Sequence, residues 1–349
     1  MKVMIVTGSM RRGGAERVIS IVSNYYASLG WDICLVRCLF PEIEYDIDAK
    51  IRTIDLSKAG SNQILDTPRL ILKLRSIIKQ EEPDALLSFM MTINFVTALA
   101  CKGLNVNFYP SERNDPATER SKFWKNAGEW AYSQSTKAIM QTNYAKKCFN
   151  QKVQSKSIII PNPVTVNEYA DSEKEKVIVT VGRLEKQKNQ KMLIHAFSII
   201  HKSHPDYKLR IYGKGSLEGE LRELTYSLNI DEYVEFMGNV NDVHHQIRKA
   251  SLFVLCSDYE GLSNALIEAM MMGLTCISTD CAGSEEIVDN GESGIIIKRG
   301  DVSSLASSIT YLIDNPIVAE SYALEATKRA TKKFSSEIVL RQWKNIVKC

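Results

Sequence analysis

The sequence predicts an α/β protein of two doubly wound parallel-sheet domains, and three observations lead to this prediction. The chain has 349 residues, which is enough for two domains with separate cores. It opens with a continuous apolar run, Met1–Thr7, followed by glycines and a helical pattern over Ala15–Leu29. The same succession of apolar strand, glycine-bearing turn and helix begins again at Lys176–Val181. Continuous apolar runs of this length are typical of parallel strands buried on both faces.

The composition is that of a soluble globular protein, with 44% hydrophobic and 24% charged residues. No apolar run is long enough to span a bilayer and no signal-peptide pattern opens the chain, so we expect a cytoplasmic protein. The net charge of +3 is too small to indicate nucleic acid as a partner. The eight cysteines include no CxxC pair, which argues against a zinc or disulfide framework.

The first half of the chain alternates strand and helix patterns. Strand patterns lie at 32–40, 85–89, 107–110 and 137–142, and helical patterns lie at 66–81, 90–103 and 121–132. After the first strand, the adjacent residues Gly13 and Gly14 permit close approach of the backbone to a ligand. This turn lacks the GxGxxG spacing of dinucleotide-binding proteins, which makes a nicotinamide cofactor a weak hypothesis.

The helix expected at 66–81 is amphipathic and basic. Thr67 can cap it, Pro68 suits its first turn, and leucines and isoleucines fill one face. The opposite face carries four cationic residues, Arg69, Lys73, Arg75 and Lys79. Such a helix either packs on the core with a solvated polar face or lies on an anionic membrane or a polyphosphate.

A second candidate for a surface patch is the segment 121–132. It interleaves lysines with the aromatic residues Phe123, Trp124 and Trp130. This mixture is typical of a membrane interface, although tryptophans on a helix also pack in cores.

Polar residues follow the strand at 107–110. Side chains just past the carboxyl end of a strand in an α/β sheet lie where ligands bind. Glu112 and Arg113 are therefore candidate acceptor contacts, and Glu112 is also a candidate base. Farther along, Pro161 and Pro163 block both helix and central strand, so we place the boundary of the first domain at residue 165.

The second half repeats the strand-and-helix rhythm. Strand patterns lie at 176–181, 207–212, 234–237, 252–255, 275–279 and 294–297, and helical patterns lie at 303–314, 317–334 and 337–348. After the strand at 176–181 come Gly182, Arg183 and Lys188, where the arginine fork and the lysine charge suit phosphate oxygens. The alternative is an exposed basic turn. After the strand at 207–212, Gly213 and Gly215 allow the backbone close to a ligand. His244 and His245 are expected at the surface or between the domains.

The stretch from 255 to 273 carries the strongest functional signal. Its strand leads into a turn with Glu260, and a helix starts at about Asn264. A helix N-terminus presents unpaired N–H groups and partial positive charge, which suit a diphosphate. Glu260 lies beside this anion seat and Glu268 a little over one turn into the helix, so the two carboxylates can each take hydroxyl groups of a sugar nucleotide. The alternative is a buried strand before an amphipathic helix with two surface glutamates.

This stretch resembles the paired-glutamate motif of the retaining GT-B glycosyltransferases, family 4. The Gly182–Lys188 turn is similar to the family's GRL-and-lysine motif, whose arginine and lysine hold the donor diphosphate. The GGAER segment resembles its first glycine-rich loop, and the loop at 238–240 resembles the one whose backbone reads the nucleobase. Many relatives place a histidine where Glu112 and Arg113 stand here.

The resemblance implies two domains facing across a cleft: 1–165 for the acceptor, 166–334 for the donor, and a helix at 335–349 that packs back on the first domain. It implies catalytic roles for Arg183, Lys188 and Glu260 and no metal or other cofactor. Donor contacts are expected from Gly13, Gly14, Gly182, Gly213, Gly215, Val240, Gly261, Leu262, Ser263, Asn264, Ala265 and Glu268. Acceptor contacts are expected from Arg12, Glu16, Arg69, Lys73, Glu112 and Arg113.

The activity implied is transfer of an N-acetylhexosamine from a UDP-sugar to a polyprenyl-diphosphate-linked glycan, at the inner face of the cytoplasmic membrane. Alternatives within the class are transfer to teichoic acid, another glycolipid or a soluble acceptor. A nucleotide-sugar epimerase of related form and a non-enzymatic nucleotide-sugar-binding protein also remain open.

Overall fold

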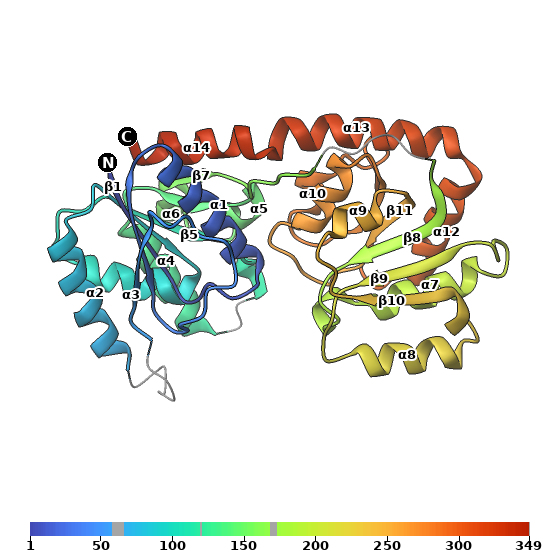
Figure 1. Ribbon diagram of the computed structural model, residues 1–349, viewed down its shortest axis with the longest axis horizontal. Coiled ribbons are helices and arrows are strands. Elements are labelled where there is room, and N and C mark those ends of the chain that lie inside the picture. Colours follow the sequence, from blue (N-terminus) through green and yellow to red (C-terminus); the bar gives the residue numbers. More distant parts are fainter. Residues whose placement is uncertain (58–65, 119–120, 168–172, 349) are drawn as a thin grey trace. The chain divides into compact units, whose positions relative to one another are not determined.

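The computed structural model describes residues 1–57, 66–118, 121–167 and 173–348, which form two compact units (Figure 1). Unit 1 comprises Met1–Pro163 and Ser336–Cys349, and unit 2 comprises Val164–Ser335. The boundaries expected from the sequence lie within two residues of these. None of the helices in the described part of the chain is both long and apolar enough to cross a membrane.

Unit 1 is built on a sheet of seven parallel strands in the order β3-β2-β1-β4-β5-β6-β7. The strands are β1 Lys2–Thr7, β2 Asp32–Arg37, β3 Arg52–Asp55, β4 Ala85–Phe89, β5 Phe108–Glu112, β6 Ala138–Met140 and β7 Ser157–Ile159. The chain builds outward from β1 to one edge, then returns to the other side of β1 with β4. The polar residues Ser111 and Glu112, expected beyond the strand, are its last two residues.

The helices of unit 1 cover this sheet. They are α1 Gly14–Ser28, α2 Thr67–Glu81, α3 Met91–Cys101, α4 Lys122–Ser133, α5 Asn143–Lys147, α6 Gln151–Lys156 and α14 Ser336–Lys348. Thr67 is the first residue of α2 and does not cap it, because Asp66 occupies the cap position. The last helix, α14, belongs to unit 1: Trp343 is fully buried, and its carbonyl accepts a 2.8 Å hydrogen bond from the Tyr26 hydroxyl of α1.

Unit 2 repeats the architecture with six parallel strands in the order β10-β9-β8-β11-β12-β13. They are β8 Glu175–Val181, β9 Lys208–Tyr212, β10 Val234–Gly238, β11 Ala250–Leu255, β12 Thr275–Thr279 and β13 Ile295–Ile297. Its helices are α7 Gln190–Ile200, α8 Glu218–Ser227, α9 Val243–Ile247, α10 Asn264–Met271, α11 Ser284–Ile287, α12 Val302–Asp314 and α13 Pro316–Phe334.

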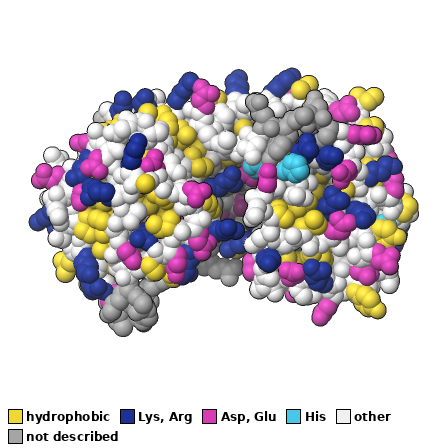
Figure 2. All heavy atoms as spheres, viewed as in Figure 1, with side chains coloured by type: hydrophobic (Ala, Val, Ile, Leu, Met, Phe, Trp, Pro, Cys, Tyr) yellow, Lys and Arg dark blue, Asp and Glu magenta, His cyan; other side chains and the backbone are white. Residues whose placement is uncertain are grey.

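Each sheet separates two apolar cores, which explains the continuous apolar runs of the sequence. In β8, Ile178 packs into the core that contains α7 and α12, whereas Val177 and Val179 pack into the core that contains α10 and α13. The predicted class, two doubly wound parallel-sheet domains, is confirmed. On the face drawn in Figure 2, basic and acidic side chains are interspersed over both units, in keeping with the small net charge.

Two strands escaped the sequence analysis because both are short. The edge strand β3 is largely exposed and reads RTID, so it lacks the apolar run of a central strand. The other, β7, lies just before Pro161 and Pro163, in a segment that we interpreted as a hinge-like connection. Its three residues end before the first proline and so keep the hydrogen bonds to β6.

Candidate functional site

The predicted catalytic residues and several of the predicted donor contacts lie at the carboxyl ends of β8 and β11 in unit 2. The predicted donor contacts Gly13 and Gly14 lie in unit 1 instead. Strands β8 and β11 are neighbours, and the chain order reverses between them, with β9 and β10 on one side and β12 and β13 on the other. In open α/β sheets ligands bind at such a reversal, just outside the strand ends. The turn after β8 contains Arg183 and Lys188, and the turn after β11 contains Glu260, so adjacent turns carry all three residues.

The turns after β8 and β9 are in close backbone contact, and glycines make this contact possible. The amide of Leu184 donates to the carbonyl of Lys214 over 3.0 Å. Gly213 has φ +128°, and a Cβ there would lie 2.0 Å from the carbonyl oxygen of Gly182. A Cβ at Gly215 would lie 2.2 Å from the carbonyl oxygen of Leu184. Both positions therefore require glycine, because the obstructing atoms belong to the backbone.

The backbone of Arg183 is held by a hydrogen bond, whereas its side chain is exposed to solvent. Its carbonyl accepts a 2.9 Å hydrogen bond from Nε2 of Gln190, which is only 3% exposed. Its side chain is exposed, and its guanidinium makes no hydrogen bond or ion pair within the described ranges. Arg183 can therefore offer its full set of donors to an anion at the strand ends.

The turns after β8 and β11 are held together by side chains and backbone. The amide of Asp258 donates to the carbonyl of Gln187 over 2.9 Å, and Gln187 Nε2 donates to the carbonyl of Tyr259, also over 2.9 Å. Asn189 Nδ2 donates to Asp258 Oδ1 over 2.9 Å. Four residues thus fix the separation of the two turns before any ligand binds, which is the preorganisation that charge stabilisation requires.

Lys188 and Glu260 form an ion pair across these turns. Their side chains are 17% and 11% exposed, and Glu260 Oε1 also accepts a 2.7 Å hydrogen bond from Ser257 Oγ. The stem of Lys188 lies against Gly182, where a Cβ would come within 3.3 Å of its Cδ. The sequence predicted separate roles for the two residues, which are 72 positions apart in the chain, and the structure brings them into direct contact.

The helix α10 starts beside this pair. Its cap is Ser263, which is 4% exposed and whose Oγ accepts from the amide of Leu266 over 3.4 Å. The amide of Ala265 is among those that an α-helix itself leaves without an acceptor. The turn that carries Gly261 and Leu262 leads into this helix start, so the predicted anion seat and Glu260 adjoin one another.

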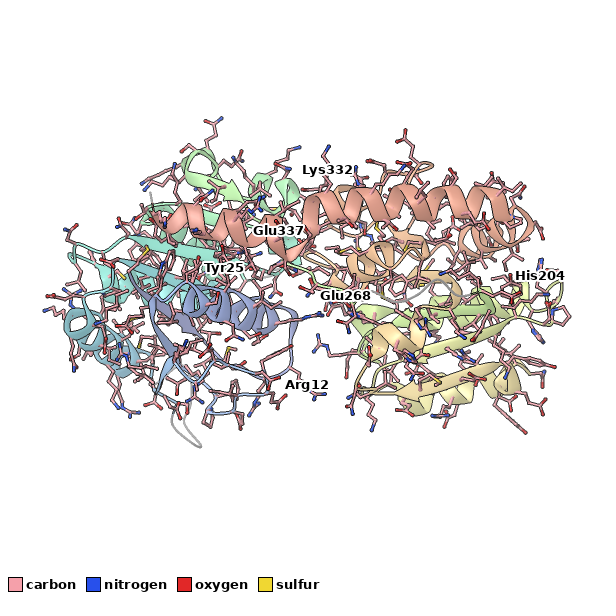
Figure 3. The ribbon with its side chains drawn as sticks, turned by 45° about the horizontal axis from the view of Figure 1, so that its top comes forward. Arg12, Tyr25, His204, Glu268, Lys332 and Glu337 are labelled. Atoms are coloured by element: carbon pink, nitrogen blue, oxygen red, sulfur yellow. The ribbon has the colours of Figure 1, made fainter. Side chains whose placement is uncertain are left out.

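Glu268 lies farther along α10 and is 5% exposed (Figure 3). Its Oε2 lies 3.1 Å from Nε2 of His244 in α9. A position at the surface is wrong for His244, whose side chain is 12% exposed and contacts Glu268 within unit 2. The spacing of the two residues could not reveal this contact, because it depends on how α9 and α10 pack.

The loop between β10 and α9 is the last of the predicted donor-binding segments in unit 2. Gly238 has φ +64°, and its carbonyl accepts a 2.8 Å hydrogen bond from the amide of Gly213. Val240 follows in this loop and is partly buried against the core beneath α10. The base-reading loop suggested by the resemblance is therefore attached to the glycine turn after β9.

In unit 1, the side chain of Glu16 in α1 lies against the glycine-rich loop that precedes this helix. Glu16 Oε1 accepts a 2.9 Å hydrogen bond from Ser9 Oγ, and a Cβ at Gly13 would lie 2.3 Å from Glu16 Oε2. Arg12 extends outward from this loop (Figure 3), with its amide bound to Glu44. Gly14 is the first residue of α1.

Glu112 is part of the framework of unit 1. It is 1% exposed, and its carboxylate accepts from the amides of Arg113 and Asn114 and, over 2.5 Å, from the Tyr132 hydroxyl. Burial raises the pKa of Glu112. This geometry favours a positioning role over direct contact with an acceptor.

Arg113 is 7% exposed and ties β5 to the connection out of unit 1. It donates to Ser111 Oγ over 2.8 Å, to the carbonyl of Ile160 over 3.0 Å and to Asn162 Oδ1 over 3.2 Å. Its guanidinium also lies 5.0 Å from the centre of the Trp343 ring in α14. By contrast, Arg69 and Lys73 are exposed on α2.

Comparisons with known proteins show what this chain is similar to. The model of the glycosyl transferases group 1 matches residues 164–332, nearly all of unit 2. An uncharacterized glycosyltransferase of Haemophilus influenzae is 27% identical over 341 residues, which cover 96% of each chain. The N-acetylgalactosamine-N,N'-diacetylbacillosaminyl-diphospho-undecaprenol 4-alpha-N-acetylgalactosaminyltransferase of Campylobacter jejuni is 27% identical over 350 residues, which cover 94% of each chain.

The crystal structure of Anabaena HepE in complex with UDP has the same fold. Its TM-score is 0.85 over the whole of both chains, at 17% identity. The sequence match covers the unit that holds Arg183, Lys188, Glu260 and Glu268, and the fold match covers both units. The chain therefore carries a domain of the glycosyl transferases group 1, on a GT-B fold.

Proposed function

We propose that the protein is a retaining, metal-independent glycosyltransferase of family 4 that uses a UDP-sugar donor. The observation that carries the proposal is the cluster at the ends of β8 and β11: an available arginine, a Lys188–Glu260 pair, the start of α10 and the buried Glu268. Cations and a helix N-terminus suit a diphosphate, and two carboxylates suit a sugar and a ribose.

In the proposed reaction, the bond between the anomeric carbon and the β-phosphate oxygen breaks. The acceptor hydroxyl forms the new bond to that carbon on the same face, its proton passes to the departing phosphate oxygen, and UDP leaves. Arg183, Lys188 and the amides near Ala265 stabilise the negative charge on the phosphate, at about 3 kcal/mol for each well-placed donor. These groups supply the positive charge that the step needs, so no metal is included.

Glu260 holds the transferred sugar and Glu268 the ribose in this proposal. Lys188 supplies the counter-charge to Glu260 beside the diphosphate, because an isolated carboxylate with 11% exposure is costly to bury without one. Unit 2 is the donor unit, and unit 1, with the glycine-rich loop and Arg12, is the acceptor unit.

The name of one relative supports the proposed substrates. The Campylobacter protein is named for transfer of N-acetylgalactosamine to a sugar on diphospho-undecaprenol. We propose the same classes here: a UDP-N-acetylhexosamine donor and a polyprenyl-diphosphate-linked glycan acceptor in cell-surface polysaccharide or glycoprotein glycan assembly. Such an acceptor places the protein on the inner face of the cytoplasmic membrane.

The layer of unit 1 formed by α2, α3 and α4 suits contact with that membrane. Phe123 at the start of α4 is 64% exposed and lies edge-on to Trp124 and to Phe95 of α3. Leu72 of α2 is 68% exposed between Arg69 and Lys73, which are also exposed. Apolar tips flanked by cations are the pattern of a protein that binds anionic lipid. Arg75, one of the four cations predicted on α2, is not part of this lipid-binding pattern, because it donates hydrogen bonds to the carbonyls of Ala100 and Lys102.

Nucleotide binding tests the donor half of the proposal. UDP at about 100 times its dissociation constant is expected to stabilise the protein by about 2.7 kcal/mol, a rise in unfolding temperature that thermal-shift measurement detects. GDP and ADP at the same concentration serve as matched controls. If none of the three nucleotides raises the unfolding temperature, the protein has no donor site of this kind.

Product analysis then separates transfer from other chemistry. With a UDP-N-acetylhexosamine and a lipid-linked acceptor, mass spectrometry is expected to show a glycan longer by one sugar, together with UDP. Conversion of the donor to its epimer, or UDP release that does not depend on the acceptor, would contradict glycosyl transfer.

Vesicle binding tests the membrane contact. Phe123→Ser is expected to weaken binding to vesicles of phosphatidylglycerol and phosphatidylcholine about 10-fold, because burying one aromatic side chain in lipid contributes about 1.5–3 kcal/mol. Tyr226→Ser is the control, since Tyr226 is 76% exposed but lies on α8 of unit 2. Equal binding of the wild type and Phe123→Ser in a sedimentation assay would remove α4 from the proposal.

A further inference from the structure

A single histidine connects two parts of the donor site. His244 Nε2 lies 3.1 Å from Glu268 Oε2, and the two side chains are 12% and 7% exposed. His244 is the second residue of α9, which follows directly on the loop that starts at Gly238. The histidine therefore joins the loop after β10 to a carboxylate on α10, a different helix.

The position of His244 is fixed by its helix. Asp242 caps α9, and its Oδ1 accepts a 3.1 Å hydrogen bond from the amide of His245. Behind the helix, Ile247 is 2% exposed and packs in the core that also contains α10. With the cap and the apolar side both anchored, the imidazole reaches Glu268 from a rigid element.

The contact with His244 restricts the orientation of the Glu268 carboxylate. Glutamate has a soft last torsion, so its carboxylate plane rotates broadly unless a neighbour holds it. A carboxylate that receives two neighbouring hydroxyl groups needs a defined plane, because both hydrogen bonds depend on it. Outer groups that orient a binding side chain are worth about 10- to 100-fold in affinity at well-studied metal sites, which sets the scale here.

We propose that His244 is a positioning residue for the donor nucleoside. It holds the Glu268 carboxylate in the plane that receives the ribose hydroxyls, and it couples that carboxylate to the loop proposed to contact the base. The inference rests on the proposed donor site, and it adds a specificity determinant for ribonucleotides. The same contact predicts discrimination against nucleotides that lack ribose hydroxyls.

Binding of truncated ligands tests this role. The affinities of UDP and of 2′,3′-dideoxy-UDP are measured by titration calorimetry for the wild type, His244→Ala and Glu268→Ala. His244→Ala is expected to weaken UDP binding about 10-fold and to change dideoxy-UDP binding less than about 2-fold. In the background of Glu268→Ala, adding His244→Ala is expected to cause no further loss of UDP affinity.

Two further variants sharpen the test. His244→Gln places an amide nitrogen near the position of Nε2 and is expected to restore most of the UDP affinity that His244→Ala loses. His245→Ala is the matched control, because His245 is the neighbouring histidine on the same helix and is exposed. It is expected to bind both ligands as the wild type does.

The outcomes separate this inference from the proposed function. Equal weakening of UDP and dideoxy-UDP by His244→Ala, or failure of His244→Gln to recover UDP affinity, would mean that His244 only supports the fold. The donor site would then stand without the inference. A wild-type protein that binds no UDP would instead refute the donor site, and the inference with it.

Discussion

Arg183→Ala is expected to lower the turnover number of glycosyl transfer about 100- to 1,000-fold, as loss of one donor from a preorganised anion site does. The side chain is exposed and has no ion pair among the residues described, so its removal leaves no partner unsatisfied. Because the Arg183 carbonyl, and not its side chain, holds Gln190, the turn after β8 keeps its hydrogen bonds. The loss should therefore appear in catalysis while the unfolding temperature stays unchanged.

The measurement compares initial rates at saturating donor with thermal unfolding of the same preparations. Lys191→Ala is the charge control: Lys191 is the second residue of the neighbouring helix α7, its side chain is 56% exposed, and its Nζ lies 3.5 Å from Glu220 Oε1. It is expected to keep the wild-type rate. A rate for Arg183→Ala within about 3-fold of the wild type would exclude this arginine from stabilising the leaving phosphate, since a useful donor contributes about 3 kcal/mol.

The elements and residues predicted from the sequence are those whose chemistry is local. The β8–turn–helix and β11–turn–helix segments each carry their functional residues within a few positions of a strand end. The sequence that predicts the strand therefore also predicts that these residues lie at the edge of the sheet. The ion pair between Lys188 and Glu260 was not predicted, because it depends on β8 and β11 being neighbours. The contact of His244 with Glu268 was missed because it depends on how α9 and α10 pack.

In unit 1 the sequence predicted the position of a possible site but not which residues are accessible there. Glu112 and Arg113 stand at a strand end, where a sequence pattern indicates a ligand site. Their burial follows from Tyr132 on α4 and from the connection at Ile160, neither of which is near them in the chain. Polar residues at a strand end thus indicate where a site lies, but tertiary packing decides which of them remain open to a ligand.

Gly213→Ala is expected to destabilise unit 2 by about 3 kcal/mol and to abolish donor binding, combining left-handed backbone strain with overpacking. The new Cβ would lie 2.0 Å from the carbonyl oxygen and 2.8 Å from the carbonyl carbon of Gly182. Both are backbone atoms, so relief requires the turn that carries Arg183 to move away from the turn after β9. The amides of Gly182 and Leu184, which donate to the carbonyls of Tyr212 and Lys214 and so join the two turns, would then lose their partners.

Gly219→Ala is the matched control, because a Cβ at Gly219 in α8 would meet nothing within 4 Å. Alanine replaces glycine in a helix with a gain of up to about 1 kcal/mol, so this variant should be as stable as the wild type or more so. Thermal unfolding should place Gly213→Ala about 10 °C below the wild type at this size of unit, and calorimetry should detect no UDP binding. A Gly213→Ala protein with wild-type stability and UDP affinity would show that the glycine turn does not set the position of Arg183.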